Sequence, residues 1–185
     1  MRKLIYSMTV SLDGYIADPD GAIDWTAPDE ELLRFHNQRV RETGPQLYGR
    51  HLYETMLVWE TDPSMRDDEL QGEFADAWSA IPKVVFSHTL ESVEGNARLA
   101  AGTVAEEVAG ALAATEKDVE IGGAGLAGQA IELGLVDEFR IFRSPVIVGG
   151  GTPLLPPVTD RIDLELIETR TFSSRVVFER YARGA

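Results

Sequence analysis

Cysteine is absent from the 185-residue sequence. The chain can therefore form no disulfide, thiolate zinc site, iron–sulfur cluster or cysteine nucleophile, which fits a reducing compartment. Long apolar runs are also missing, because no stretch approaches the roughly 18 residues of a membrane span. The mixed residues after Met1 are unlike a secretory signal. We therefore expect a cytoplasmic protein with no membrane partner.

Positive charge is scarce relative to negative charge. The chain has 17 Lys and Arg residues against 31 Asp and Glu residues, a net charge of −14 at pH 7. Such a field repels polyanions, so we expect no nucleic-acid partner, and an anionic ligand needs a local cationic cluster. No internal repeat and no linker-like segment divides the chain, so we expect one domain over residues 1–185.

Strand and helix patterns alternate up to about residue 135, after which only strand patterns follow. The sequence predicts strands over 4–12, 46–48, 83–87, 119–121, 139–148, 164–171 and 176–181. It predicts helices over 28–41, 50–57, 74–81, 104–112 and from the glycines at 122–125 to about 133. Thr103, with Glu106 three residues later, is typical of a capping box. The predicted fold is α/β: a mostly parallel central sheet flanked by helices, with an antiparallel C-terminal edge.

Ligands of such sheets bind beyond the carboxyl ends of the strands. At one expected end, Gly49-Arg50-His51 combines a glycine turn, a guanidinium and an imidazole. At another, Ser87-His88-Thr89 offers two hydroxyls and a ring nitrogen. Gly122-Gly123 at a third end leads into a helix, whose N-terminal amides attract anions. Together these three ends predict a site for a phosphate-bearing cofactor.

The segment Gly123–Gly128 matches the pattern G-x-G-x-x-G. It occurs late in the chain, and the next strand carries Arg140 and Arg143 instead of the expected acid, which disfavours a Rossmann unit. Two simpler interpretations stay open: backbone amides that bind a pyrophosphate, or a tight turn without a ligand. No metal-binding motif occurs, so we expect no metal site, and we expect His36 to be a semi-exposed structural residue.

The sequence resembles the dihydrofolate reductase-like superfamily, and more closely its branch related to the reductase domain of bacterial riboflavin biosynthesis. The resemblance covers most of the chain and rests on the order and spacing of five motifs. These are MTVSLDGYIA at 8–17, LYGRHLYE at 47–54, SHT at 87–89, IGGA at 121–124 and PVIVGGGTPL at 145–154. Because the chain has no cysteine for the zinc site of that branch's deaminase domain, we expect a stand-alone reductase.

The resemblance implies that the cofactor is NADPH. Its phosphates would lie against three groups of residues: Gly49, Arg50 and His51; Ser87, His88 and Thr89; and Gly122, Gly123, Ala124, Gly125 and Leu126. Met8, Thr9 and Ile16 would flank the nicotinamide, and 18–23 would be a mobile loop over the hydride site. The Gly-Gly peptide of this superfamily is often cis, a strained feature that Gly122-Gly123 could share.

Hydride transfer also needs a proton donor, and the resemblance suggests a carboxylate. Trp25-x-x-Pro28-x-Glu30 matches the W-x-x-P-x-D/E spacing of dihydrofolate reductases, which makes Glu30, Asp29 or Asp24 the candidate catalytic acid. The alternative is that acids after a proline only stabilise a helix start. Asp13 has a similar pair of interpretations: a substrate-side acid, or part of an Asp-Gly turn.

We therefore expect an NADPH-dependent reductase that transfers a hydride to a small heterocyclic or ribosyl substrate. That substrate would be like a pterin or dihydrofolate, or like 5-amino-6-(5-phosphoribosylamino)uracil. The alternative is a non-catalytic NADPH-binding or interaction module of the same fold. We also expect a homodimer, because apolar strands over 139–148 and 176–178 would form an exposed edge of the sheet that a second copy could cover.

Overall fold

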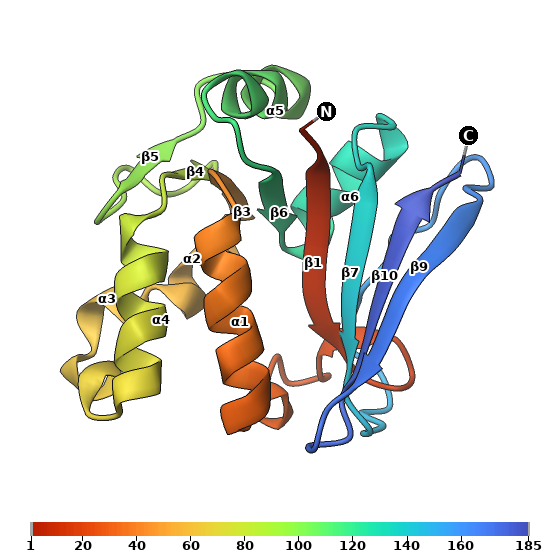
Figure 1. Ribbon diagram of the computed structural model, residues 1–185. Coiled ribbons are helices and arrows are strands. Elements are labelled where there is room, and N and C mark those ends of the chain that lie inside the picture. The colour runs from red at the N-terminus through yellow and green to blue at the C-terminus, as the bar shows by residue number, and fades with distance from the viewer. Residues whose placement is uncertain (1, 185) are drawn as a thin grey trace.

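One eight-stranded sheet organises the structure, a computed structural model that describes residues 2–184 (Figure 1). Its strands lie in the order β5-β4-β3-β6-β1-β7-β10-β9. Their bounds are β1 (Leu4–Val10), β3 (Gln46–Gly49), β4 (Lys83–Phe86), β5 (Ala97–Leu99), β6 (Val119–Gly122), β7 (Glu138–Arg143), β9 (Leu164–Thr171) and β10 (Val177–Arg183). Neighbours from β5 to β7 are parallel, and β10 is antiparallel to both β7 and β9. The predicted fold class is confirmed.

Helices cover both faces of the sheet (Figure 1). They are α1 (Glu30–Glu42), α2 (Arg50–Met56), α3 (Val58–Thr61), α4 (Glu69–Ala80), α5 (Val104–Ala113) and α6 (Ala124–Glu132), with the 3-10 helices η1 (Asp24–Thr26) and η2 (Pro63–Arg66). The predicted capping box is confirmed, since Thr103 and Glu106 bond to each other's backbone amides. Within residues 2–184, no helix is long and apolar enough to cross a membrane.

β1 lies in the middle of the sheet because both of its faces are apolar at its start. Leu4, Tyr6 and Val10 enter the cluster formed with α5 and α6. Ile5, which is fully buried, points to the opposite face by the alternation of a strand. On that opposite face, α1 and α4 pack against Tyr48, Val85 and Phe142.

Several element boundaries differ from the sequence prediction. β7 ends at Arg143 instead of 148, because Pro145 has no N–H for the ladder and the chain turns there to donate from Val146 to Ser144. α4 begins at Glu69, capped by the Asp68 carboxylate, ahead of the expected helix over 74–81. The sequence prediction missed β5, α3, η2 and the two-strand sheet of β2 (Tyr15–Ala17) and β8 (Thr152–Pro153).

Candidate active site

The residues predicted to bind a ligand lie along one edge of the sheet. β1, β3, β4 and β6 run parallel and end at Val10, Gly49, Phe86 and Gly122. Their carboxyl ends therefore face the same side, where ligands of parallel sheets bind. The starts of α2 and α6 follow two of these ends directly. The predicted groups at 49–51, 87–89 and 122–126 are thus brought to one edge.

Two strand-to-helix junctions touch each other at this edge. A Cβ added to Gly123 would lie 3.8 Å from the Gly49 nitrogen, and one added to Gly49 would lie 3.8 Å from Leu126 Cβ. Gly123 has φ +89°, a backbone conformation that favours glycine. Gly122 is closely packed, since its added Cβ would overlap the Leu52 side chain. No cis peptide occurs within residues 2–184, so the Gly122–Gly123 peptide is trans.

The start of α6 suits a bound anion. Its N-cap, Gly123, has no side chain that could accept hydrogen bonds from the first backbone amides of this nine-residue helix. Its first N–H groups are therefore free to bind a phosphate oxygen, and the helix dipole favours negative charge there. Ala124 and Gly125 also line a groove of about 510 Å³ that runs between α6 and Pro156.

The ends of β3 and β4 are joined by side chains. Arg50 Nη1 donates to Thr89 Oγ1 over 2.6 Å. Ser87 Oγ accepts from the Thr89 amide at 3.1 Å and from the Leu90 amide at 2.9 Å, which holds the turn after β4. Arg50 Nε lies 3.4 Å from a carboxylate oxygen of Glu54, one turn along α2. The guanidinium and the hydroxyl are thus held together at the edge.

The other predicted contacts are more dispersed. His51 and His88 are exposed, and the His51 side chain retains 93% of its accessible surface. Met8 and Ile16 pack against the same apolar cluster on the α6 side of the sheet. Thr9 points to the opposite, α1 side by strand alternation. Thr9 and Ile16 therefore approach the end of β1 from different faces.

The three candidate catalytic carboxylates lie in η1 and at the start of α1. Asp29 caps this helix: one oxygen accepts from the Leu32 amide at 2.9 Å and the other from Ser173 Oγ at 2.9 Å. The Glu30 carboxylate is 74% exposed and pairs with Arg34 at 2.6 Å. Asp24 is exposed in η1. Helix capping thus accounts for Asp29, and a catalytic role for any of the three stays a prediction.

Asp13, which the sequence allows to be either a substrate-side acid or part of a turn, binds a glycine loop through its carboxylate. Its carboxylate accepts from the amides of Gly149 at 2.8 Å and Val148 at 3.2 Å. Hydrogen bonds, first from Ser11 and then from these amides, lower the pKa of Asp13. A Cβ on Gly151, which has φ +113°, would overlap the Ala17 carbonyl. Asp13 thus fixes a glycine loop that packs against the start of the predicted mobile loop.

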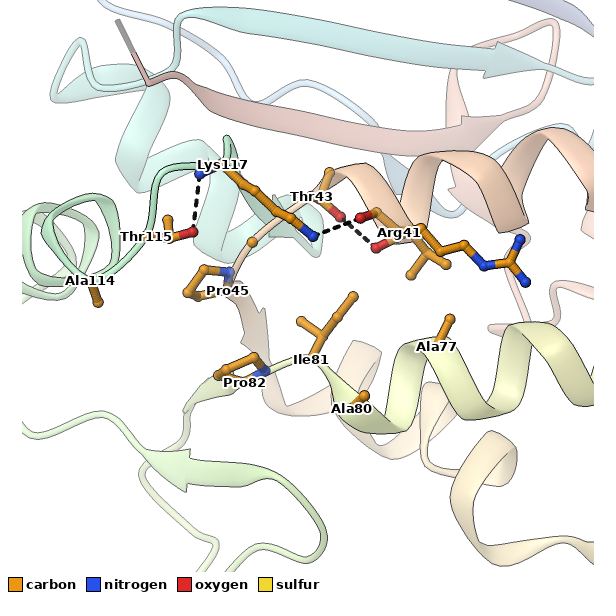
Figure 2. Close-up of a pocket in the computed structure, with 12 residues that line it drawn as sticks. Arg41, Thr43, Pro45, Ala77, Ala80, Ile81, Pro82, Ala114, Thr115 and Lys117 are labelled. Carbon is orange, nitrogen blue, oxygen red and sulfur yellow. Dashed lines mark hydrogen bonds between the residues drawn. The ribbon is translucent and has the colours of Figure 1, made fainter.

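A second cavity lies at the opposite end of the sheet (Figure 2). It measures about 440 Å³ and is lined by small apolar side chains such as Ala77, Ile81 and Pro82. Lys117 Nζ donates to the Arg41 carbonyl over 2.7 Å at its wall. Pro82 directly precedes β4, so this cavity adjoins the amino ends of the strands. None of the predicted site residues lines it.

Known proteins resemble this chain over most of its length. The uncharacterized protein YyaP of Bacillus subtilis (strain 168) is 36% identical over 179 residues, which cover 95% of this chain and 92% of that protein. A Shewanella sp. PV-4 structure, of a protein with a proposed role in riboflavin biosynthesis, has a TM-score of 0.76 at 24% identity and covers 99% of both chains.

A bifunctional enzyme of Thermotoga maritima is a more distant structural relative. It is named diaminohydroxyphosphoribosylaminopyrimidine deaminase/5-amino-6-(5-phosphoribosylamino)uracil reductase, and the match has a TM-score of 0.66 at 18% identity. The match covers 99% of this chain and 57% of that one. The family model of the RibD C-terminal domain matches residues 2–178. The chain therefore belongs to the RibD C-terminal domain family, in agreement with the resemblance found in its sequence motifs.

Proposed function

We propose that the chain is an NADPH-dependent reductase that transfers a hydride to a small heterocyclic or ribosyl substrate. The substrate would be like a pterin or dihydrofolate, or like the phosphoribosylaminouracil in the name of the Thermotoga maritima relative. The observation that carries the proposal is the contact between Arg50 and Thr89, beside two touching glycine junctions at the ligand-binding edge. In a protein of net charge −14, such a contact is a local site for phosphate.

The residues at this edge fit NADPH by their chemistry. Arg50 offers a guanidinium fork to the 2′-phosphate, and the uncapped amides at the start of α6 suit the pyrophosphate. Gly49 and Gly123, which lack a Cβ, let the two junctions lie against each other, so that both present backbone to the same edge. Thr9 lies at the end of β1, where the nicotinamide would be placed. When bound, NADPH supplies the hydride.

One observation favours the second candidate, a non-catalytic NADPH-binding module. Asp29 is engaged in capping α1, and Glu30 pairs with Arg34 at the surface, so neither carboxylate is held free beside β1. Both candidates require NADPH binding, and only the reductase requires oxidation of NADPH by a pterin or an aminopyrimidine. A substrate panel with spectroscopic detection of NADPH therefore separates them.

Thermal denaturation with NADPH, NADH and neither tests the cofactor assignment. A ligand at 100 times its Kd stabilises by about 2.7 kcal/mol, or about 5 to 10 °C for a chain of this size. We expect that shift for NADPH and a smaller one for NADH. Arg50→Ala should weaken NADPH binding roughly tenfold or more while affecting NADH less, because only NADPH carries the 2′-phosphate.

Arg161→Ala is the matched control, since Arg161 is an exposed arginine paired only with Asp163 two residues on. It should leave both shifts unchanged. Equal losses for NADPH and NADH in Arg50→Ala would contradict the assignment of Arg50 to the 2′-phosphate. No shift with either nucleotide would refute the cofactor assignment as a whole.

A further inference from the structure

His36 lies beside the predicted nicotinamide position. It projects from α1, and its ring centroid is 4.6 Å from that of Phe142 on β7, at an interplanar angle of 48°. Phe142 is the register partner of Thr9 on β1. Register partners on parallel strands point to the same face, and neighbouring strands are about 4.8 Å apart. His36, Phe142 and Thr9 therefore form a continuous group on the α1 side of the sheet.

This group borders accessible space, although β1 is a central strand. Leu4, Ile5 and Tyr6 are buried, whereas Ser7 and Thr9 further along keep accessible surface. Ser7 and Thr9 share the face toward α1 by strand alternation. The half of β1 nearer the ligand-binding edge is thus open on the side where His36 lies.

The imidazole of His36 has unused hydrogen-bonding capacity. No side chain or backbone group within residues 2–184 bonds to either ring nitrogen, and neither nitrogen is among the fully enclosed polar atoms without a partner. Each nitrogen therefore keeps a small accessible surface, although the ring as a whole is half-buried between α1 and β7. A neutral imidazole offers one donor and one acceptor.

The surroundings keep His36 uncharged. Burial lowers its pKa to about 4. No carboxylate contributes to its pKa shift. A group of this kind suits an uncharged polar atom better than a phosphate or carboxylate, because it brings no positive charge of its own.

We propose that His36 contacts the substrate: its imidazole hydrogen-bonds to a ring N–H or carbonyl on the uncharged heterocyclic part, beside Thr9. This inference rests on the proposed reductase function and deepens it. This contact would orient the substrate so that its ring faces α1 and any phosphate points away from His36. His36 is then a binding residue for the ring, in place of the structural role expected from the sequence. The sequence signal was its position between Phe35 and Val40 on the apolar side of the helix.

The three histidines of the chain make this inference measurable. His51 and His88 lie at the predicted phosphate end, and His36 lies at the ring end. A ¹H–¹³C NMR spectrum of the imidazole Cε1 atoms therefore contains three signals, which His→Gln variants at each position assign. The probes are NADPH, 2′-phospho-ADP-ribose, which lacks the nicotinamide, and then pterin or 5,6-diaminouracil added in the presence of NADP⁺.

We expect NADPH to shift all three signals and 2′-phospho-ADP-ribose to shift only those of His51 and His88. Pterin or 5,6-diaminouracil should then shift the His36 signal further. If NADPH shifts the His51 and His88 signals but the His36 signal responds neither to NADPH nor to either ring compound, the inference is overturned. The proposed cofactor site would then still be supported. A response of His36 to NADPH but to neither ring compound also overturns the substrate contact. If no signal moves with NADPH, the proposed function itself fails.

His36→Phe provides a second, independent readout. It keeps an aromatic ring against Phe142 and removes both nitrogens. We expect unchanged NADPH binding and about tenfold weaker binding of the ring compound that shifts His36, the loss of one hydrogen bond to a desolvated group. His36→Gln, which keeps a donor and an acceptor, should restore part of that affinity. Equal affinity in wild type and His36→Phe would contradict the contact.

Discussion

Asp29 and Glu30 are adjacent acids with different physical roles. The Asp29 carboxylate caps α1 and also accepts from Ser173, whereas Glu30 makes a surface ion pair with Arg34. A lost N-cap costs about 1 to 2 kcal/mol, and an exposed pair is worth only a few tenths. We therefore expect Asp29→Ala to lower the free energy of unfolding by about that amount and Glu30→Gln to leave it nearly unchanged in urea denaturation.

Glu30→Gln also tests catalysis without disturbing the fold. If Glu30 supplies the proton, as the W-x-x-P-x-D/E spacing predicts, the variant should bind NADPH normally and lose most of its turnover of a pterin or aminopyrimidine. Normal turnover would leave helix stabilisation as the role of Glu30. Similar losses in Glu30→Gln and Arg34→Ala would point to their ion pair instead of proton transfer.

His36 makes stability depend on pH. Its pKa is about 4 in the folded chain and 6.5 in an unfolded one, so the unfolded state binds the proton more tightly. The full contribution is present above pH 6.5 and is lost as the pH falls toward 4, by up to about 3 kcal/mol. We expect His36→Phe to flatten the loss of unfolding free energy between pH 6.5 and 4, measured by urea denaturation. A parallel loss in both proteins would contradict the buried, neutral state.

At the scale of elements, Gly122 and Gly125 are close in sequence but differ in their surroundings. A Cβ on Gly122 would overlap Leu52 and lie 3.3 Å from the Tyr48 ring, whereas one on Gly125 meets nothing within 4 Å. Gly122→Ala should therefore destabilise by about 1 to 3 kcal/mol. Gly125→Ala lies within α6 and should stabilise the ligand-free protein by up to about 1 kcal/mol, because alanine favours helix.

The Gly125→Ala variant also tests whether the start of α6 binds a phosphate. If the pyrophosphate lies against the first amides of α6, Gly125→Ala should weaken NADPH binding even though it stabilises the protein. Calorimetric titration of NADPH, combined with thermal denaturation, measures both effects. Unchanged affinity in this variant would place the cofactor away from Gly125.

Elements with strong local signals could be predicted from the sequence, and those defined by distant contacts could not. The capping box at Thr103 and the glycine junctions at 49 and 122 depend on neighbouring residues, and the structure contains the capping box and both junctions. β8 has two residues, and only its pairing with β2 defines it as a strand. The contact of His36 with Phe142 joins residues about 100 positions apart, beyond the reach of periodicity.

At the scale of the whole molecule, the expected reason for dimerisation was wrong although the dimer itself stays a prediction. Phe139, Phe142 and Phe178 are buried core residues, and β7 lies inside the sheet, not at its edge. One of the two edge strands is β9, an eight-residue strand that is mostly exposed and carries Leu164, Leu166 and Ile167 (Figure 1). Such an edge offers unpaired backbone groups to another strand.

We expect the partner of β9 to be a second copy of the chain. Antiparallel pairing about a two-fold axis at Thr169 would place Glu168 of each copy opposite Arg170 of the other, so that opposite charges would meet twice. We expect light scattering to give about twice 20.3 kDa. Leu166→Glu should shift the protein to monomer, whereas Val58→Glu, on α3 beyond the other end of the sheet, should not. A monomeric wild type would refute this prediction.

The central position of β1 has a consequence for synthesis of the chain. β1 is made first, yet its strand partners are residues 119–121 and 138–143. At about 5 to 20 residues per second, a ribosome needs roughly 5 to 20 s to reach the first of them. During that time Leu4, Ile5 and Tyr6, which are buried in the folded protein, have no strand to pair with. β1 is therefore the strand that waits longest for its partners during synthesis, and the strand on which a chaperone has the longest time to act.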